Sequence, residues 1–165
     1  MKTELRLAVP EDRDFLFQLY SSTRMQEIAP FGWPAAQQGA FLRMQFNAQQ
    51  SWYETAYAAA EQKIIEIDGS PIGRIMVVRE PNAWLLIDIS LLPELRGRGV
   101  GTELMQSLIR DCAAAGAVLR LQVLRVNPAQ RLYKRLGFAV TGEDPIYLQM
   151  ELRPASDAES QAARP

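Results

Sequence analysis

The sequence of 165 residues contains no histidine and only one cysteine, Cys112. Without histidine, the chain cannot build His-ligated metal sites or the Ser-His-Asp and Cys-His arrangements of nucleophilic catalysis. A single cysteine cannot close an internal disulfide. These absences remove several common chemistries, and we expect no metal site.

Long apolar runs are also missing. The longest, residues 83–92, is interrupted by Asp88 and Ser90 and has the length of a strand, not of a membrane span. The first fourteen residues carry several charges and lack the apolar stretch of a secretion signal. We therefore expect a cytoplasmic protein without membrane association.

The net charge is −1, but the charges are unevenly distributed along the chain. Residues 91–140 hold eight basic and three acidic residues, a local balance of +5, so the remaining chain carries −6. An overall balance near zero argues against nucleic-acid binding, which favours a basic domain. A basic half that contains a glycine-rich loop is better suited to a small polyphosphate ligand.

That glycine-rich loop follows an apolar strand-like run and opens an amphipathic helix. Its sequence is Leu95-Arg96-Gly97-Arg98-Gly99-Val100-Gly101-Thr102. Three glycines in five residues let consecutive N–H groups converge on one anion, and the helix start adds free N–H groups and a positive dipole end. The loop does not match a Walker sequence, and Thr102 stands where the dinucleotide fingerprint needs glycine. We therefore predict a pyrophosphate-binding loop of another type.

Hydrophobic periodicity and turn residues predict helices and strands around one sheet. Strands are expected at residues 4–8, 63–67, 71–79, 84–92, 118–124, 138–140 and 146–152. Helices are expected from residue 10, over 40–59, from 101 to Gly116 and from 128 to Gly137, with an irregular stretch at 24–39. This order predicts an α+β or α/β domain. Residues 154–165 lack large apolar side chains, and we expect them to form a disordered tail.

Two segments resemble the signatures of the GNAT N-acyltransferase superfamily. Residues 89–101 contain Arg96, Gly99 and Gly101 at the family's spacing of Arg or Gln, two residues, Gly, one residue, Gly or Ala. Residues 127–138 resemble the second signature, in which an asparagine precedes a helix that carries a tyrosine and ends in Leu-Gly-Phe. The resemblance covers about residues 3–152. It implies one GNAT-like domain over residues 1–153, with a mixed, splayed central sheet flanked by helices in three layers.

The resemblance implies acetyl-CoA as the acyl donor. Backbone groups of Leu91 and Leu92 would bind the pantetheine arm, in a gap between the strands at 84–92 and 118–124. The side chain of Asn127 would also hold the arm, and a plain helix N-cap is a compatible alternative. The residues implied at the pyrophosphate are Arg96, Gly97, Arg98, Gly99, Val100, Gly101 and Thr102.

Acyl transfer to an amine needs a neutral amine, a donor for the oxyanion and a proton for the departing thiolate. Tyr133 matches the family's tyrosine and is our candidate acid, with packing in an apolar stripe as the alternative. Asp88 is the candidate base, because a carboxylate among apolar neighbours is unusual, and a structural aspartate is the alternative. Some family members carry a base glutamate on the next strand, where this chain has Gln122. That departure favours Asp88 or a water-mediated route.

No residue identifies the acceptor amine, which is a small molecule or a protein amine. The resemblance places it near residues 24–53 and the final strands. Candidate pocket residues are Phe31, Trp33, Trp52, Tyr53 and Glu27.

The favoured function is N-acetylation of a primary amine by direct attack in a ternary complex, because Cys112 is expected to be a core thiol and not a nucleophile. A non-catalytic acyl-CoA-binding regulatory module is the first alternative. A nucleotide-binding α/β domain is the second, although its glycine loop would normally follow the first strand. The resemblance also allows a homodimer, since dimers are common in the family.

Overall fold

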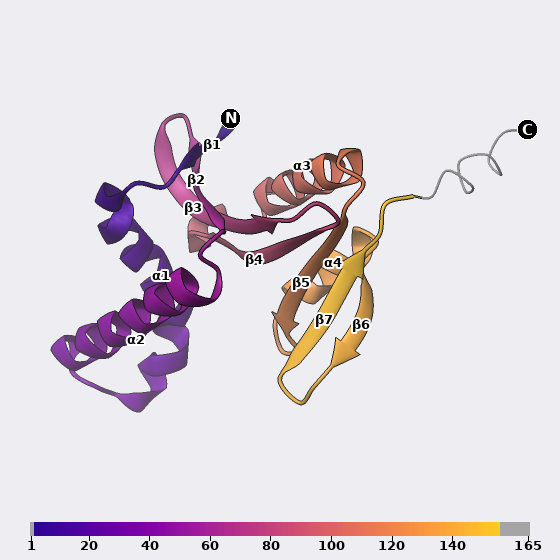
Figure 1. The fold of residues 1–165 in the computed structure, drawn as a ribbon. Coiled ribbons are helices and arrows are strands. Elements are labelled where there is room, and N and C mark those ends of the chain that lie inside the picture. The colour runs from indigo at the N-terminus through magenta and orange to yellow at the C-terminus, as the bar shows by residue number, and fades with distance from the viewer. Residues whose placement is uncertain (1, 156–165) are drawn as a thin grey trace, which may run out of the picture. The chain divides into compact units, whose positions relative to one another are not determined.

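The computed structural model describes residues 2–155 of the chain. Within these residues seven strands form one open mixed sheet in the order β1-β2-β3-β4-β5-β7-β6, accompanied by four α-helices (Figure 1). The predicted α+β class with a mixed sheet is confirmed. Of the predicted disordered tail, residues 156–165 lie outside the described residues.

The elements agree closely with those predicted. The strands are β1 (Thr3–Leu7), β2 (Glu61–Ile67), β3 (Ser70–Arg79), β4 (Ala83–Leu91), β5 (Val118–Leu124), β6 (Ala139–Glu143) and β7 (Tyr147–Leu152). The helices are α1 (Arg13–Ile28), α2 (Ala35–Ala56), α3 (Val100–Ala114) and α4 (Ala129–Arg135), with 3-10 turns at Pro10–Asp12, Ala29–Phe31 and Pro93–Leu95.

The chain divides into two compact units. The first comprises the residues up to Met76 together with Asp88–Val100, and the second comprises Val77–Ile87 and the residues from Gly101 onwards. The strands β3 and β4 each contribute residues to both units.

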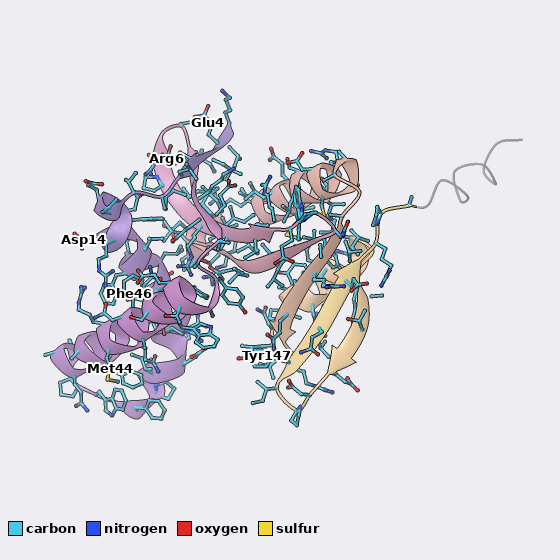
Figure 2. The ribbon with its side chains drawn as sticks, in the orientation of Figure 1. Glu4, Arg6, Asp14, Met44, Phe46 and Tyr147 are labelled. Atoms are coloured by element: carbon cyan, nitrogen blue, oxygen red, sulfur yellow. The ribbon has the colours of Figure 1, made fainter. Side chains whose placement is uncertain are left out.

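In the first unit, α1 and α2 pack against each other and share an apolar core (Figure 1). Phe46 of α2 is completely buried there, whereas Met44 on the same helix is exposed (Figure 2). The core also holds Leu16, Tyr20, Ile28, Leu42 and Ile64. The hairpin between β2 and β3 turns at Asp68 and Gly69, whose φ angles of 51° and 78° explain the Asp-Gly pair predicted there.

An ion pair holds the start of α1 to β1. Arg6 donates two hydrogen bonds of 2.8 Å to the two carboxylate oxygens of Asp12, and the N–H of Val9 donates to Oδ2 of the same carboxylate at 2.8 Å. These contacts lower the pKa of Asp12 below its usual value, and the hydrogen bonds from the Arg6 guanidinium have the largest effect. Asp12 therefore acts as a charged link between the first strand and the first helix.

The stretch predicted as irregular, residues 24–39, is confirmed only at its centre, where Pro30 and Gly32 lie. The helix α1 continues into this stretch, and α2 begins within it. Gly39, the last residue of the stretch predicted as irregular, lies inside α2 and is exposed. One glycine costs a helix about 1 kcal/mol, which the burial of apolar side chains further along α2 offsets.

The second unit combines two kinds of strand pairing. The strands β4 and β5 pair in parallel from Ala83↔Val118 to Leu86↔Leu121, and β5, β7 and β6 form an antiparallel ladder. The helix α3 buries the apolar face predicted for it, through Leu104, Met105, Leu108 and Cys112.

Candidate active site

The glycine loop leads from the end of β4 into α3. Gly97 and Gly99 have φ angles of 70° and 84°, in the left-handed region that favours glycine. A Cβ on either residue would have no atom within 4 Å, so backbone conformation and not packing requires glycine there. Val100 is buried and anchors the first turn of α3, while residues 96–99 are exposed. The loop therefore presents open backbone directly before a helix start.

Two hydrogen bonds fix the end of β4. The N–H of Leu92 donates to the carbonyl oxygen of Ile72 on β3 at 2.9 Å, and Nε of Arg96 donates to the carbonyl oxygen of Leu91 at 3.0 Å. Because successive residues of a strand direct their N–H groups to opposite edges, the N–H of Leu91 points away from β3. Of the two predicted arm-binding residues, Leu91 is the one whose N–H lies on the edge opposite β3.

Asp88 lies on β4 beside Arg74, a buried arginine of β3. Nη2 and Nε of Arg74 donate to Oδ2 of Asp88 at 2.8 and 3.0 Å, and Oγ of Ser90 donates to the same oxygen at 3.0 Å. Among the described residues, none of these hydrogen bonds reaches Oδ1. The charged partner of Asp88 is thus the Arg74 side chain.

Arg74 also connects Asp88 to the end of α2. Its Nη1 donates to Oε1 of Gln50 at 3.3 Å, and its Cζ lies 5.4 Å from the ring centroid of Tyr53. Burial, followed by the nearby charge of Asp88, raises the pKa of Tyr53.

A cleft of about 220 Å³ opens next to this network in the first unit. Its lining includes Gln50, Tyr53, Glu54, Tyr57, Gln62 and Met76. Gln50 and Tyr53 belong to both the cleft and the Arg74 network. The cleft therefore adjoins the ion pair that contains Asp88.

In the second unit, Asn127 precedes α4, and Tyr133 lies within the helix. Oδ1 of Asn127 accepts a hydrogen bond of 2.9 Å from the N–H of Ala129, so the capping alternative is observed. Tyr133 is only 7% exposed, and its ring lies 5.8 Å from that of Phe138. The packing expected of this aromatic is present, and the role of Asn127 in cofactor binding and that of Tyr133 as the acid stay predictions.

The predicted site residues are divided between the two units. Asp88, Leu91, Leu92, Arg96, Gly97, Arg98, Gly99 and Val100 belong to the first, and Gly101, Thr102, Asn127 and Tyr133 belong to the second. Gly101 and Thr102 form the first turn of α3.

Of the predicted acceptor residues, the structure places Tyr53 in the cleft. Phe31 and Trp33 stack on each other at 5.2 Å between α1 and α2, and Glu27 pairs with Arg24 at 3.5 Å. Trp52 is exposed.

Several cleft residues escaped the sequence analysis, although a signal existed for most of them. Gln50, Glu54 and Tyr57 recur, together with the predicted Tyr53, at the i, i+3, i+4, i+7 spacing of one helix face. Arg74 and Asp88 are isolated charges in successive strands, and the pairing of β3 with β4 brings them together. Nothing in the sequence marks Gln62.

Residues 2–155 contain neither a cluster of metal-binding side chains nor a helix that could cross a membrane. Among residues 2–155, no three His, Cys, Asp or Glu side chains gather closely enough to hold a metal ion. No helix in the same range is both long and apolar enough to cross a membrane.

The profile of the acetyltransferase (GNAT) family matches residues 22–138. The chain belongs to this family. The resemblance recognised in the sequence is confirmed, and the glycine loop and the segment beginning at Asn127 both lie within the matched residues. A sequence comparison with curated proteins gave no match.

Solved structures share the fold over nearly the whole chain. The PaiA N-acetyltransferase from Thermoplasma acidophilum, in complex with coenzyme A, is 20% identical with a TM-score of 0.70, over 93% of this chain and 99% of that one. A histone acetyltransferase HPA2 and related acetyltransferase from Corynebacterium glutamicum is 21% identical with a TM-score of 0.69, over 94% and 98%. The ribosomal-protein-S18-alanine N-acetyltransferase from Escherichia coli is 14% identical with a TM-score of 0.65, over 94% and 96%. At these identities the likeness establishes the fold.

Proposed function

We propose that this GNAT family member is an N-acetyltransferase that transfers the acetyl group of acetyl-CoA to a primary amine by direct attack in a ternary complex. The observation that carries the proposal is the loop with Gly97 and Gly99 at positive φ, open on its outer side and followed directly by α3. The backbone N–H groups of Arg98, Gly99, Val100 and Gly101 would bind the pyrophosphate, because a helix start leaves its first N–H groups unpaired.

The remaining donor contacts follow from the hydrogen bonds already made. The N–H of Leu91 is the backbone group suited to the pantetheine arm, since that of Leu92 is engaged with Ile72. Arg96 and Thr102 flank the loop and would complete the pyrophosphate contacts. Asn127 uses Oδ1 as a helix cap, which leaves its Nδ2 to donate to a carbonyl of the arm.

Acetyl-CoA would supply the thioester, and two side chains would move protons. Asp88, acting through Oδ1 or a water, would accept the proton that the amine loses as the new N–C bond forms. Tyr133 would donate its phenol proton to the sulfur as the C–S bond breaks, so that the products are the N-acetyl amine and the free thiol. Gln122, exposed on β5, carries no carboxylate and cannot replace Asp88 as the base.

The direct test is release of free thiol from acetyl-CoA in the presence of a panel of primary amines. We expect amine-dependent thiol release that follows saturation kinetics in both substrates. Saturable acetyl-CoA binding without amine-dependent release by any amine would favour the regulatory module and contradict a catalytic role.

A further inference from the structure

The cleft at the end of α2 is smaller than the site of a drug-sized ligand. At about 30 Å³ per water molecule, its volume of about 220 Å³ corresponds to roughly seven waters. It therefore suits a ligand, or the end of a chain, with a small number of non-hydrogen atoms. Its lining residues all belong to the first unit.

One lining side chain has a buried polar atom that lacks a partner. Nε2 of Gln62 is inaccessible to solvent and has no hydrogen-bond partner among the described residues. A buried donor without a partner costs about 1–3 kcal/mol, so such atoms are uncommon in native structures and call for an explanation. Rotation of the Gln62 side chain toward the cleft that it lines would let a ligand oxygen satisfy this donor. Gln49 carries a similarly unpaired Oε1 but is not among the residues that line the cleft.

The charge and ring chemistry of the cleft favour a cation. Glu54 contributes an exposed carboxylate, and none of the lining residues is Lys or Arg. The rings of Tyr53 and Tyr57 lie 6.4 Å apart, and the face of a tyrosine ring attracts an ammonium group. Arg74, which touches Tyr53 from outside the lining, is matched by the charge of Asp88. The lining thus suits an ammonium group better than an anion.

We propose that this cleft binds the acceptor, and that the acceptor is a small primary amine with a carbonyl or hydroxyl oxygen a few bonds from its nitrogen. The ammonium group lies between Glu54 and the tyrosine rings, and the oxygen accepts from Nε2 of Gln62. Because Gln50 and Tyr53 also contact Arg74, the bound amine lies beside the pair that holds Asp88. This inference rests on the proposed function and specifies its substrate class.

The test compares two amines that differ in one group. L-leucinamide and 3-methylbutylamine are the same molecule with and without a carboxamide, and calorimetry at about pH 6.5 keeps both amines mainly cationic. We expect L-leucinamide to bind about tenfold more tightly, as one satisfied hydrogen bond predicts. Gln62→Met should abolish this preference, and Gln62→Leu repeats the test with a shorter side chain. Gln49→Met is the matched control and should keep the preference. Glu54→Gln should lower the binding affinity for both amines by a similar factor.

Three results would overturn the inference: no preference for L-leucinamide, a preference that survives both Gln62 variants, or equal loss of it in Gln49→Met. Acetyl-CoA is titrated separately into the same samples. If acetyl-CoA binds and is turned over, but the Gln62 variants bind both amines as the unaltered protein does, the cleft assignment alone is contradicted. Amine binding that depends on Gln62, without acetyl-CoA binding, would contradict the proposed function and leave the cleft as an amine site.

Discussion

Arg74 and Asp88 form an ion pair in which one partner is more deeply buried than the other, and we therefore expect the two residues to stabilise the fold unequally. The Arg74 side chain is 6% exposed and that of Asp88 is 25% exposed. Asp88→Asn would leave the more deeply buried charge without its counter-ion, and we expect a loss of about 3–4 kcal/mol in the free energy of unfolding. Arg74→Met would leave a partly solvated carboxylate that the hydroxyl of Ser90 still reaches, so we expect about 2 kcal/mol.

Urea denaturation of both single variants and the double variant measures these losses. For a chain of this length, the loss in Asp88→Asn corresponds to a fall in Tm of roughly 6–16 °C. The double variant should lose less than the sum of the single variants, because no buried charge is left unpaired. Arg125→Met is the matched control at an exposed ion pair with Glu143, and it should cost no more than about 0.5 kcal/mol. Equal losses in the two single variants, or strict additivity, would contradict an unequal contribution of Arg74 and Asp88 to stability.

Three further predictions concern catalysis, pH and packing. Tyr133→Phe should reduce kcat at least tenfold while acetyl-CoA affinity stays within about twofold, and full turnover would remove Tyr133 from the mechanism. Asp12→Asn should cost about 1–2 kcal/mol at neutral pH. Because the folded pKa of Asp12 lies below its unfolded value of 3.8, this difference should vanish as pH falls through the folded pKa, whereas a constant difference down to about pH 2 would contradict the ion pair. In Gly73→Ala the new Cβ would collide with the carbonyl oxygen of Ser90 and lie 2.8 Å from Leu91, costing about 2–3 kcal/mol, whereas Gly39→Ala on the exposed face of α2 should be neutral or stabilising in the same urea titration.

Local features were predictable because nearby residues determine them. The Asp68-Gly69 turn, the apolar face of α3 and the loop with Gly97 and Gly99 each depend on a few consecutive residues whose backbone or burial pattern has one common solution. The same local reasoning was wrong at Gly39, because the burial of apolar side chains further along α2 outweighs the low helix propensity of one glycine.

Features that depend on distant residues could not be predicted. The partner of Asp88 is Arg74, fourteen residues away on β3. The burial of Arg74 follows from the strand pairing and not from any local pattern. The cleft brings Tyr53 of α2 together with Gln62 of β2 and Met76 of β3. The sequence identified Tyr53 only as one aromatic among several, because what distinguishes it is its position next to Arg74.

A calorimetric titration with acetyl-CoA, with NADH and ATP as control ligands, tests whether the glycine loop binds the acyl donor. Gly99→Asp places a carboxylate in the loop, and Gly116→Asp is the matched control, since Gly116 has a φ of 66° and open space beyond the other end of α3. We predict saturable binding of acetyl-CoA alone, lost in Gly99→Asp and retained in Gly116→Asp. Unchanged affinity in Gly99→Asp, or no binding by the unaltered protein at millimolar acetyl-CoA, would contradict the assignment of the loop.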